Sequence, residues 1–475
     1  MSDAQRDLAA RSETPRRIFP PGFVLGAATA AYQIEGAHDA DGRGASIWDV
    51  FSHTPGRTMG GDTGDVAADH YNRLNDDLDL MQSLGLQAYR FSVSWPRIQA
   101  DGSGPANLLG IDFYSRLIDG LRERDITPIA TLYHWDLPQA LEDAGGWPER
   151  DTSYRFAEYA SIMGNALGDR VAMWTTLNEP WCSAFMGYAS GEHAPGRTDD
   201  LAALTASHHL NLAHGLALSA LRDSVSDPSA QYSVTLNFHG LEPVDSTSPE
   251  AIARIDALTH RTFLDPMLNG RLSDRLVSDT QGITDWSFVE PGDLALINQP
   301  IDVLGLNYYS SDEVRMRDHA GDDNPTAWPG SRNVEFVPTR RSRTAMGWGI
   351  VPEGLETLLV SLSTEFPDLP LMVTENGAAF DDVEERGAVH DEDRVAYLSQ
   401  HFDAALRAID RGVDLRGYLV WSLIDNFEWA LGYAKRFGII RVDYETLERT
   451  VKDSGTWLAD VISSQPRSRP LVEHN

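Results

Sequence analysis

Apolar and polar positions along the chain follow two alternating patterns. Short runs rich in apolar and β-branched residues, typical of buried strands, are each followed by a longer stretch with apolar residues at helical spacing. The expected strands are Phe23–Ala30, Ala88–Trp95, Thr127–Trp135, Trp174–Glu179, Tyr232–Phe238, Val303–Tyr309, Leu371–Glu375 and Leu415–Leu423. The expected helices are Asn72–Leu84, Ile111–Arg124, Ser153–Leu167, Leu201–Leu221, Pro249–Leu268, Gly354–Glu365, Asp391–Arg411 and Asp453–Ile462.

This alternation predicts an α/β protein, and the strand ends favour a barrel over an open doubly wound sheet. Each strand run ends in a polar or aromatic side chain, and such side chains converge only if the strands form a ring. They are Gln33, Arg90 with Trp95, His134 with Trp135, Asn178 with Glu179, Asn237, Asn307 with Tyr309, Glu375 and Trp421. We predict a single (β/α)8 TIM barrel over residues 16–463, with long βα loops at its carboxyl face. Residues 1–15 and 464–475 are expected to be mobile tails.

Composition narrows the class of protein. A net charge of −32 over 475 residues disfavours nucleic acid and anionic membranes as partners. Cys182 is the only cysteine, which excludes an internal disulfide and fits a reducing compartment. No stretch reads as a signal peptide or a membrane span, so we expect a cytoplasmic location. No metal-ligand motif or P-loop is present, and we expect neither metal nor cofactor.

Two glutamates at the ends of expected strands suggest a catalytic function. Glu179 follows a strand that Pro180 ends, and Glu375 ends another strand far along the chain. A carboxylate at the end of a buried strand is costly unless an ion pair or a reaction explains it. Both explanations are open for either residue taken alone, but the matching pair favours catalysis.

The surrounding residue types suit a sugar substrate. Amides and carboxylates bind hydroxyl groups, and indole rings pack on the C–H faces of a pyranose. Glycosidic cleavage needs an acid on the leaving oxygen and a second carboxylate at the anomeric carbon. Glu375, near Arg90 and Tyr309, is expected to be the ionised nucleophile, and a buried Glu179 the protonated acid. Trp95 fits a core position equally well, and Cys182 is expected to be inert.

Several motifs in a fixed order carry a resemblance to a known family. From about Phe19 to Ile462 the chain resembles the β-glucosidases of glycoside hydrolase family 1. The matching stretches are YQIEGA (32–37), YRFSVSWPRI (89–98), LYHWDLPQAL (132–141), TLNEPW (176–181), GLNYY (305–309), TENGA (374–378) and DNFEWALGY (425–433). Ala45 and Arg441 depart from the family's usual residues, which are proline and an apolar or aromatic residue.

The resemblance implies a retaining exo-β-glucosidase. It makes Glu179 the acid/base and Glu375 the nucleophile, with Arg90, Asn178 and Tyr309 as their supports. It places the non-reducing sugar against Gln33, His134, Asn178, Glu428 and Trp429, with Trp421 beneath it and Trp348 along the leaving-group channel. Trp135, Asn307 and Phe437 complete the expected substrate-binding set.

Other functions are compatible with parts of this pattern. A 6-phospho-β-glycosidase of the same family is disfavoured because Glu428 would repel a phosphate dianion. A β-galactosidase or β-fucosidase stays open, since Gln33 and Glu428 can bind either orientation of the 4-hydroxyl. A catalytically silent sugar-binding barrel is the non-enzyme alternative. We expect a β-glucoside or oligosaccharide substrate, a role in cellulose or other polysaccharide degradation, and either a monomer or a homo-oligomer.

Overall fold

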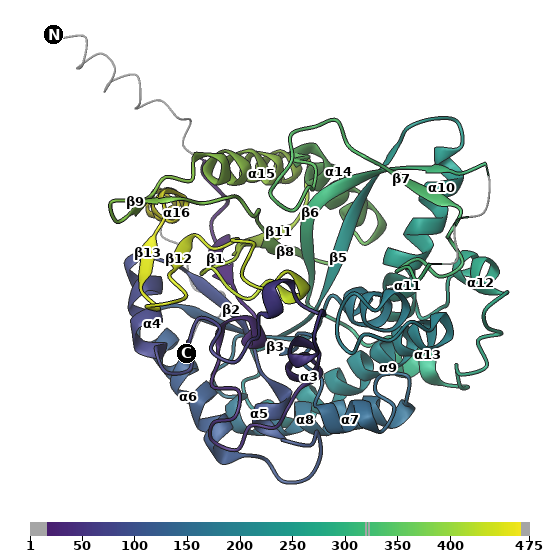
Figure 1. Ribbon diagram of the computed structural model, residues 1–475, viewed down its shortest axis with the longest axis horizontal. Coiled ribbons are helices and arrows are strands. Elements are labelled where there is room, and N and C mark those ends of the chain that lie inside the picture. The colour runs from purple at the N-terminus through teal and green to yellow at the C-terminus, as the bar shows by residue number, and fades with distance from the viewer. Residues whose placement is uncertain (1–16, 319–320, 322–323, 467–475) are drawn as a thin grey trace.

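The computed structural model describes residues 17–318, 321 and 324–466, and within them eight parallel strands close into a barrel (Figure 1). The ring closes because β1 pairs with both β2 and β11, while β5 pairs with β6. The barrel strands are β1 (Val24–Ala28), β2 (Ala88–Ser92), β3 (Thr127–Tyr133), β4 (Met173–Asn178), β5 (Gln231–Pro243), β6 (Val303–Met316), β8 (Leu371–Asn376) and β11 (Leu415–Trp421). The predicted (β/α)8 barrel is therefore confirmed.

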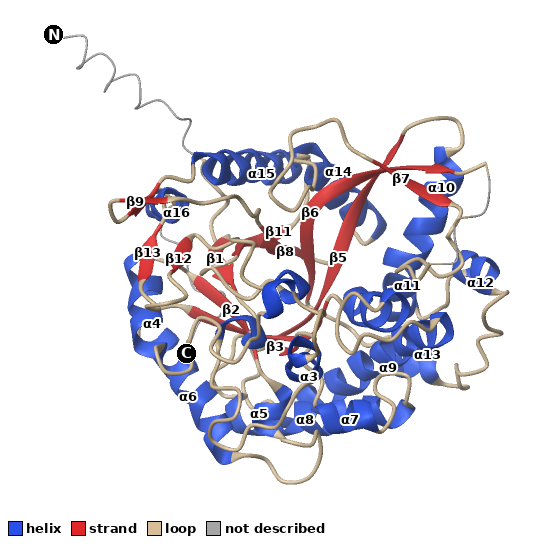
Figure 2. Cartoon of the chain, in the orientation of Figure 1, coloured by secondary structure: helices blue, strands red, loops and turns tan. Residues whose placement is uncertain are grey.

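Helices surround the strands, as the blue and red elements of Figure 2 show. The larger ones are α4 (Leu74–Ser83), α6 (Leu108–Arg122), α8 (Arg150–Leu167), α9 (Asp200–Ser224), α10 (Ser248–Asp256), α11 (Thr262–Asn269), α14 (Pro352–Glu365), α15 (Glu392–Asp410) and α16 (Asp453–Ser463). Each joins one barrel strand to the next or follows the last. Among the described residues, no helix has the length and apolar character needed to cross a bilayer.

Shorter elements occupy the connections. The short α-helices are α2 (Ala31–Ile34), α3 (Ile47–His53), α5 (Trp95–Ile98), α7 (Gln139–Asp143), α12 (Asp274–Thr280) and α13 (Asp293–Ile297). The 3₁₀ and π turns are η1 (Met59–Gly61), η2 (Cys182–Ser190), η3 (Ala257–Arg261) and η4 (Trp429–Leu431). The accessory strands are β7 (Val334–Val337), β9 (Glu384–Glu385), β10 (Ala388–Val389), β12 (Ile440–Val442) and β13 (Arg449–Val451).

Burial explains why the strand runs are almost continuously apolar. Every residue of β4 and of β8 is buried, because helices cover the barrel outside and packed side chains fill it inside. Outer helices instead bury one stripe, as α6 does through Phe113, Leu117 and Leu121. The barrel thereby holds the carboxyl ends of its strands rigidly at one face.

Two predicted helix bounds differ from the structure for local reasons. Helix α6 begins at Leu108 rather than Ile111, since the Asn107 side chain accepts the Leu109 N–H and caps the helix. The predicted helix Pro249–Leu268 is divided into α10 and α11 by the π turn η3.

The division into one domain and two tails stays a prediction. Residues 1–15 lie outside the described residues, as does the second predicted tail from residue 467 onward. At the described end, Gln465 accepts the Phe19 N–H at 2.9 Å and donates to the Arg17 carbonyl at 2.7 Å. The two ends of the described chain are therefore bonded to each other.

Candidate active site

Two buried carboxyl groups lie at the carboxyl ends of two barrel strands, β4 and β8, which β5 and β6 separate in the ring. Glu179 directly follows the last residue of β4, and Glu375 is the last but one residue of β8. Glu179 is 6% exposed and Glu375 is 3% exposed. Both side chains need partners, because an unpaired buried carboxylate is costly.

A continuous hydrogen-bond network joins the two groups. The Arg90 guanidinium, from β2, donates to Glu375 Oε1 at 2.6 Å and to Asn178 Oδ1 at 2.7 Å. The Asn307 amide, from β6, donates to Asn178 Oδ1 at 3.0 Å and to Glu179 Oε1 at 2.8 Å. Four strands thus contribute side chains to one site. Asn178 Oδ1 accepts from Arg90, which bonds to Glu375, and from Asn307, which bonds to Glu179, so it links the two carboxyl groups.

Glu375 has a second donor on its other oxygen. The Tyr309 hydroxyl donates to Glu375 Oε2 at 2.7 Å, and the Tyr309 carbonyl accepts from Tyr397 at 3.0 Å. The strand end is fixed further because Asn376 donates to the Tyr308 carbonyl at 2.7 Å. Both oxygens of Glu375 therefore accept strong hydrogen bonds, which favour its ionised form.

The chain after Glu375 passes very close to the end of β11. A Cβ atom on Gly377 would lie 1.7 Å from the Trp421 carbonyl oxygen, so no larger residue fits there. This contact keeps the nucleophile candidate and the tryptophan beside it in fixed relation.

Electrostatics assign different protonation states to the two carboxyl groups. Burial and then the negative charge of Glu375 raise the pKa of Glu179 to about 8. Burial also raises the pKa of Glu375 above its ordinary value, but Arg90 and Tyr309 oppose this shift. Since the cation bonds directly to Glu375 and reaches Glu179 only through Asn178, the shared proton belongs on Glu179.

Three residues of this site have a strained backbone conformation. Glu179, Trp135 and Trp429 adopt positive φ angles of 46°, 77° and 50°, a region that non-glycine residues seldom occupy. The π turn η2 begins at Cys182, just past Glu179. Such conformations persist only where the surrounding structure enforces them, and they are characteristic of functional sites.

Cys182 contacts the acid candidate, which the sequence analysis missed. Its Sγ lies 3.5 Å from Glu179 Oε2, and the thiol donates to that oxygen. Burial, with the nearby Glu179, raises the pKa of the Cys182 thiol well above its ordinary value, so the sulfur stays protonated and is a poor nucleophile. The only sequence signal was the spacing of three residues from Glu179, within one turn of the following helix.

Two buried acceptor oxygens that follow barrel strands, one after β1 and one after β11, have no partner among the described residues. The Gln33 amide donates to Asn426 Oδ1 at 3.1 Å and to the Phe427 carbonyl at 2.8 Å, which leaves Gln33 Oε1 unpaired. Glu428 Oε2 is likewise buried and unpaired. Buried polar atoms of a folded protein normally have partners, so these two acceptors point to a ligand that brings hydroxyl donors.

His134 has a ring nitrogen available for a ligand, whereas the indole N–H of Trp135 bonds within the protein. Asn178 Nδ2 donates to His134 Nε2 at 3.1 Å, so the imidazole proton lies on Nδ1, which is buried and unpaired. Burial and then Arg90 hold the pKa of His134 well below its ordinary value, and the ring is neutral. Trp135 donates its indole N–H to the Asn178 carbonyl at 3.0 Å, so only its ring is free to contact a ligand.

Aromatic rings form two groups around this space. Trp429 packs against Trp135 at 4.5 Å between ring centroids, and His134 lies 5.8 Å from Trp421. The second group joins Trp348 to Tyr309 at 5.5 Å and to Phe437 at 6.2 Å. The predicted sugar-binding tryptophans therefore lie in these two ring groups, and Tyr309 of the second group bonds directly to Glu375.

One strand-end residue from the sequence analysis lies elsewhere. Trp95 begins α5, is fully buried and stacks on Tyr159 of α8 at 5.1 Å, so it is a core residue. The reason is that β2 ends at Ser92, before Trp95. Asn237 of β5 is the register partner of Asn307 of β6 and contacts His239 at 3.4 Å, so it lies at the same level of the barrel as the site.

A (β/α)8 barrel with a neutral and an ionised carboxyl group at its strand ends, flanked by unpaired acceptors and tryptophans, defines a glycoside hydrolase. The chain belongs to glycosyl hydrolase family 1, whose model matches residues 15–466. It is 52% identical over 452 residues to a bifunctional β-D-glucosidase/β-D-fucosidase of Bifidobacterium breve, covering 93% of this chain and 97% of the relative. It is 46% identical to β-glucosidase A of Thermotoga maritima, covering 94% and 98% of the two chains.

Solved structures agree with this assignment. A Thermotoga maritima β-glucosidase in complex with deoxynojirimycin superposes with a TM-score of 0.89 at 45% identity, covering 94% of this chain and 99% of that chain. A psychrophilic β-glucosidase from Micrococcus antarcticus gives a TM-score of 0.89 at 48% identity, with 94% and 97% covered. The predicted resemblance is confirmed over nearly the whole chain.

Proposed function

We propose that this chain is a retaining exo-β-glucosidase that releases terminal non-reducing β-D-glucosyl residues from cellobiose-like disaccharides and from aryl or alkyl β-glucosides. The observation that carries the proposal is the network through Arg90, Asn178 and Asn307, which separates an ionised Glu375 from a protonated Glu179. We place the reaction in the last step of cellulose breakdown and in the cytoplasm, where the single cysteine suits a reducing environment.

The first step forms a covalent sugar ester. The Glu375 carboxylate attacks the anomeric carbon while Glu179 gives its proton to the glycosidic oxygen, so the C–O bond breaks and the leaving group departs as an alcohol. Tyr309 and Arg90 hold Glu375 at both oxygens and thus fix the direction of attack. Retention requires the two carboxyl groups roughly 5–5.5 Å apart.

The second step reverses the charges. Once Glu375 is an ester, its negative charge no longer raises the pKa of Glu179, which then ionises readily. Ionised Glu179 takes a proton from water, the water oxygen attacks the anomeric carbon, and Glu375 leaves as a carboxylate. Glucose is released in the β configuration.

Neutral hydroxyl groups suit the sugar pocket better than a phosphate does. Gln33 Oε1 and Glu428 Oε2 are acceptors, which would repel a dianion. Of the chain's two lysines, Lys435 donates to the Ala345 carbonyl and Lys452 lies in a buried ion pair. Both observations disfavour a 6-phospho-β-glycosidase.

A β-fucosidase activity is the second candidate, and the same acceptors favour it. The Gln33 amide oxygen and the Glu428 carboxyl group can each accept from a 4-hydroxyl in either orientation, so a sugar that lacks the 6-hydroxyl can still bind. The Bifidobacterium breve relative carries both activities in its name. We therefore include β-fucosides among the substrates to be tested.

The proposed function predicts a specific ranking in a panel of 4-nitrophenyl β-glycosides. The glucoside should exceed its 6-phosphate in kcat/KM by about 100-fold or more, because transfer of a dianion beside Glu428 is unfavourable. Proton NMR should show β-glucose as the first product. Glucose binding without turnover of any glycoside would favour the silent barrel, and α-glucose as first product would exclude the retaining mechanism.

The protonation of Glu179 also predicts the pH dependence. Glu179 must be protonated in the free enzyme, so kcat/KM should be lost as the pH rises through its pKa of about 8. On the acidic side, kcat/KM should be lost as Glu375 becomes protonated. A pH profile of kcat/KM with an alkyl β-glucoside measures both limbs, and loss of activity already near pH 5 on the basic side would contradict the assignment.

A further inference from the structure

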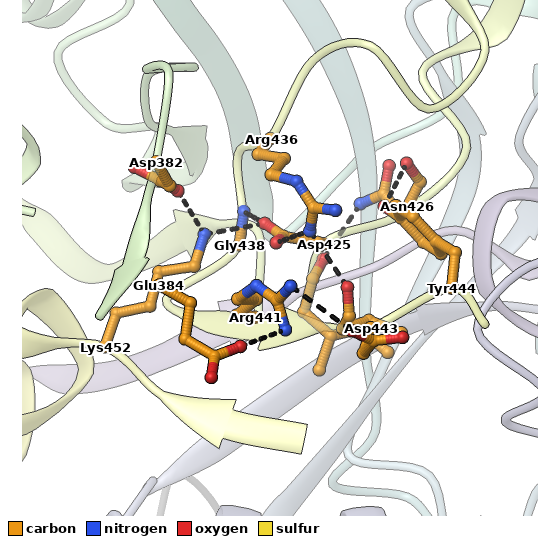
Figure 3. A network of polar contacts seen from close by, with 12 residues as sticks. Asp382, Glu384, Asp425, Asn426, Arg436, Gly438, Arg441, Asp443, Tyr444 and Lys452 are labelled. Carbon is orange, nitrogen blue, oxygen red and sulfur yellow. Dashed lines mark hydrogen bonds and ion pairs between the residues drawn. The ribbon is translucent and has the colours of Figure 1, made fainter. Parts of the chain in front are cut away.

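Lys452 links two loops that border the sugar pocket. It directly precedes α16, is fully buried, and its ammonium group donates to Asp382 and, at 2.7 Å, to Asp425 (Figure 3). Asp382 belongs to the loop after β8, the strand of Glu375, and Asp425 belongs to the loop after β11. A lysine rarely lies fully buried unless it is paired, and here it bridges segments from neighbouring strands.

The ion pairs around Lys452 are balanced in charge. Arg394 of α15 donates to Asp382 at 2.9 Å and pairs with Asp391, while Arg436 donates to Asp425 Oδ2 at 2.6 Å. Three cations thus face three buried aspartates. Removal of Lys452 leaves three aspartates with two cations, and Asp382 and Asp425 each keep only one cationic partner, so each member of such a network constrains the others.

The network reaches the sugar pocket through the residue after Asp425. Asn426 Oδ1 accepts one Gln33 amide hydrogen, and the Phe427 carbonyl accepts from the same amide nitrogen. These two bonds determine that Gln33 turns its oxygen, rather than its nitrogen, toward the pocket. Glu428, with the unpaired Oε2, follows in the same loop.

The catalytic carboxyl groups depend on other contacts. Glu179 and Glu375 are held by side chains from β2, β6 and η2, whereas the Lys452 ammonium group bonds to Asp382 and Asp425. A change at Lys452 should therefore alter the hydrogen bonds to the sugar's 4- and 6-hydroxyls and leave Glu179 and Glu375 in place.

We propose that Lys452, acting through Asp425, is a positioning residue for recognition of the sugar's 4- and 6-hydroxyls. It holds residues 425–429 where Gln33 Oε1 and Glu428 Oε2 can accept from those hydroxyls. The inference rests on the proposed β-glucosidase function. It assigns sugar selectivity to a side chain that does not itself contact the substrate.

The test is Lys452→Met, which keeps the length of the side chain and removes the charge. For wild type and variant, kcat/KM is measured on 2,4-dinitrophenyl β-glucoside and on its 4-deoxy and 6-deoxy analogues. We expect the preference for glucoside over the deoxy analogues to fall about tenfold, with the rates on the analogues changed less than about threefold. Equal losses on all substrates, or no change in preference, would overturn the proposal.

A second variant keeps the test valid if the single variant does not fold. Lys452→Met combined with Asp382→Asn restores the charge balance but not the bridge between the loops. It should melt closer to the wild type than the single variant and still lack the preference. Recovery of the preference in this double variant would show that sugar selectivity depends on charge balance and not on the bridge, which would overturn the proposal.

Arg441 provides a matched control in the same region. It pairs with Glu384 at 2.9 Å and with Asp443 at 3.3 Å, and its ion pairs are more exposed than those of Lys452 (Figure 3). Arg441→Leu should leave both the rates and the preference unchanged. If wild-type protein fails to cleave the glucoside at all, the proposed function fails, independently of the result for Lys452.

Discussion

Replacement of Glu375 by alanine is expected to abolish hydrolysis, with kcat/KM for β-glucosides falling on the order of 10⁵-fold or more. The substitution removes the carboxylate that bonds directly to Arg90, and with it the group placed to attack the anomeric carbon. Arg90 and Tyr309 would remain, but neither can form a sugar ester. Steady-state kinetics on 4-nitrophenyl β-glucoside measure the loss.

Added azide should reveal which face of the sugar Glu375 occupies. In Glu375→Ala a small anion can enter the vacated space beside Arg90 and attack the anomeric carbon from that side. With 2,4-dinitrophenyl β-glucoside as donor, the product should be α-glucosyl azide, identified by NMR. A β-azide would show that the nucleophile assignment is wrong.

A matched control separates this effect from general damage. Glu353 is an exposed glutamate in the first turn of α14, outside the hydrogen-bond network of Glu179 and Glu375. Glu353→Ala should retain wild-type rates and should yield no azide product beyond that of the wild type. Circular dichroism and thermal melting of Glu375→Ala should show a folded protein.

The sequence predicted the barrel because two physical periods are visible in it. Buried parallel strands must be apolar throughout, and covering helices must be apolar on one stripe, so the eight repeats could be read directly. Glu179 and Glu375 stood out because carboxylates rarely end such strands. Trp95 was ambiguous for the opposite reason, since an indole suits a core and a sugar face equally well.

Other features of the site depend on contacts that no local pattern encodes. The positive φ of Glu179 directs its side chain toward Asn307 and Cys182, and the local amino-acid sequence does not reveal this backbone conformation. Lys452 lies 27 residues after Asp425, and the pairing of β12 with β13 brings the two together, because the Ile440 carbonyl accepts the Asp425 N–H and the Ile439 carbonyl accepts the Lys452 N–H. Local composition thus predicts where polar groups gather, and tertiary structure decides which atom each one presents.

Glu179→Gln is expected to affect substrates according to their leaving groups. Glutamine cannot give a proton, so kcat/KM for alkyl β-glucosides should fall about 10²–10⁴-fold. 2,4-Dinitrophenolate departs without protonation, and kcat/KM for its glucoside should change less than about tenfold. Asn307 can still contact the new amide group, so the site should keep its shape.

In the same variant, hydrolysis of the covalent sugar ester should become the slow step. Without Glu179 as base, water attacks the sugar ester slowly, so the covalent intermediate should accumulate and appear as a burst of dinitrophenolate followed by slow turnover. Azide needs no base, and it should restore turnover and give β-glucosyl azide. Equal losses on alkyl and dinitrophenyl glucosides would contradict the acid/base role.

The two variants test each other through the stereochemistry of their azide products. Azide enters from the face of Glu375 in one variant and from the face of Glu179 in the other, so a retaining enzyme must give opposite anomers. General damage to the site would reduce both reactions without selecting an anomer. The pair of products therefore reports whether the two carboxyl groups, which the network of Arg90, Asn178 and Asn307 joins, lie on opposite sides of one anomeric carbon, as the proposed double displacement requires.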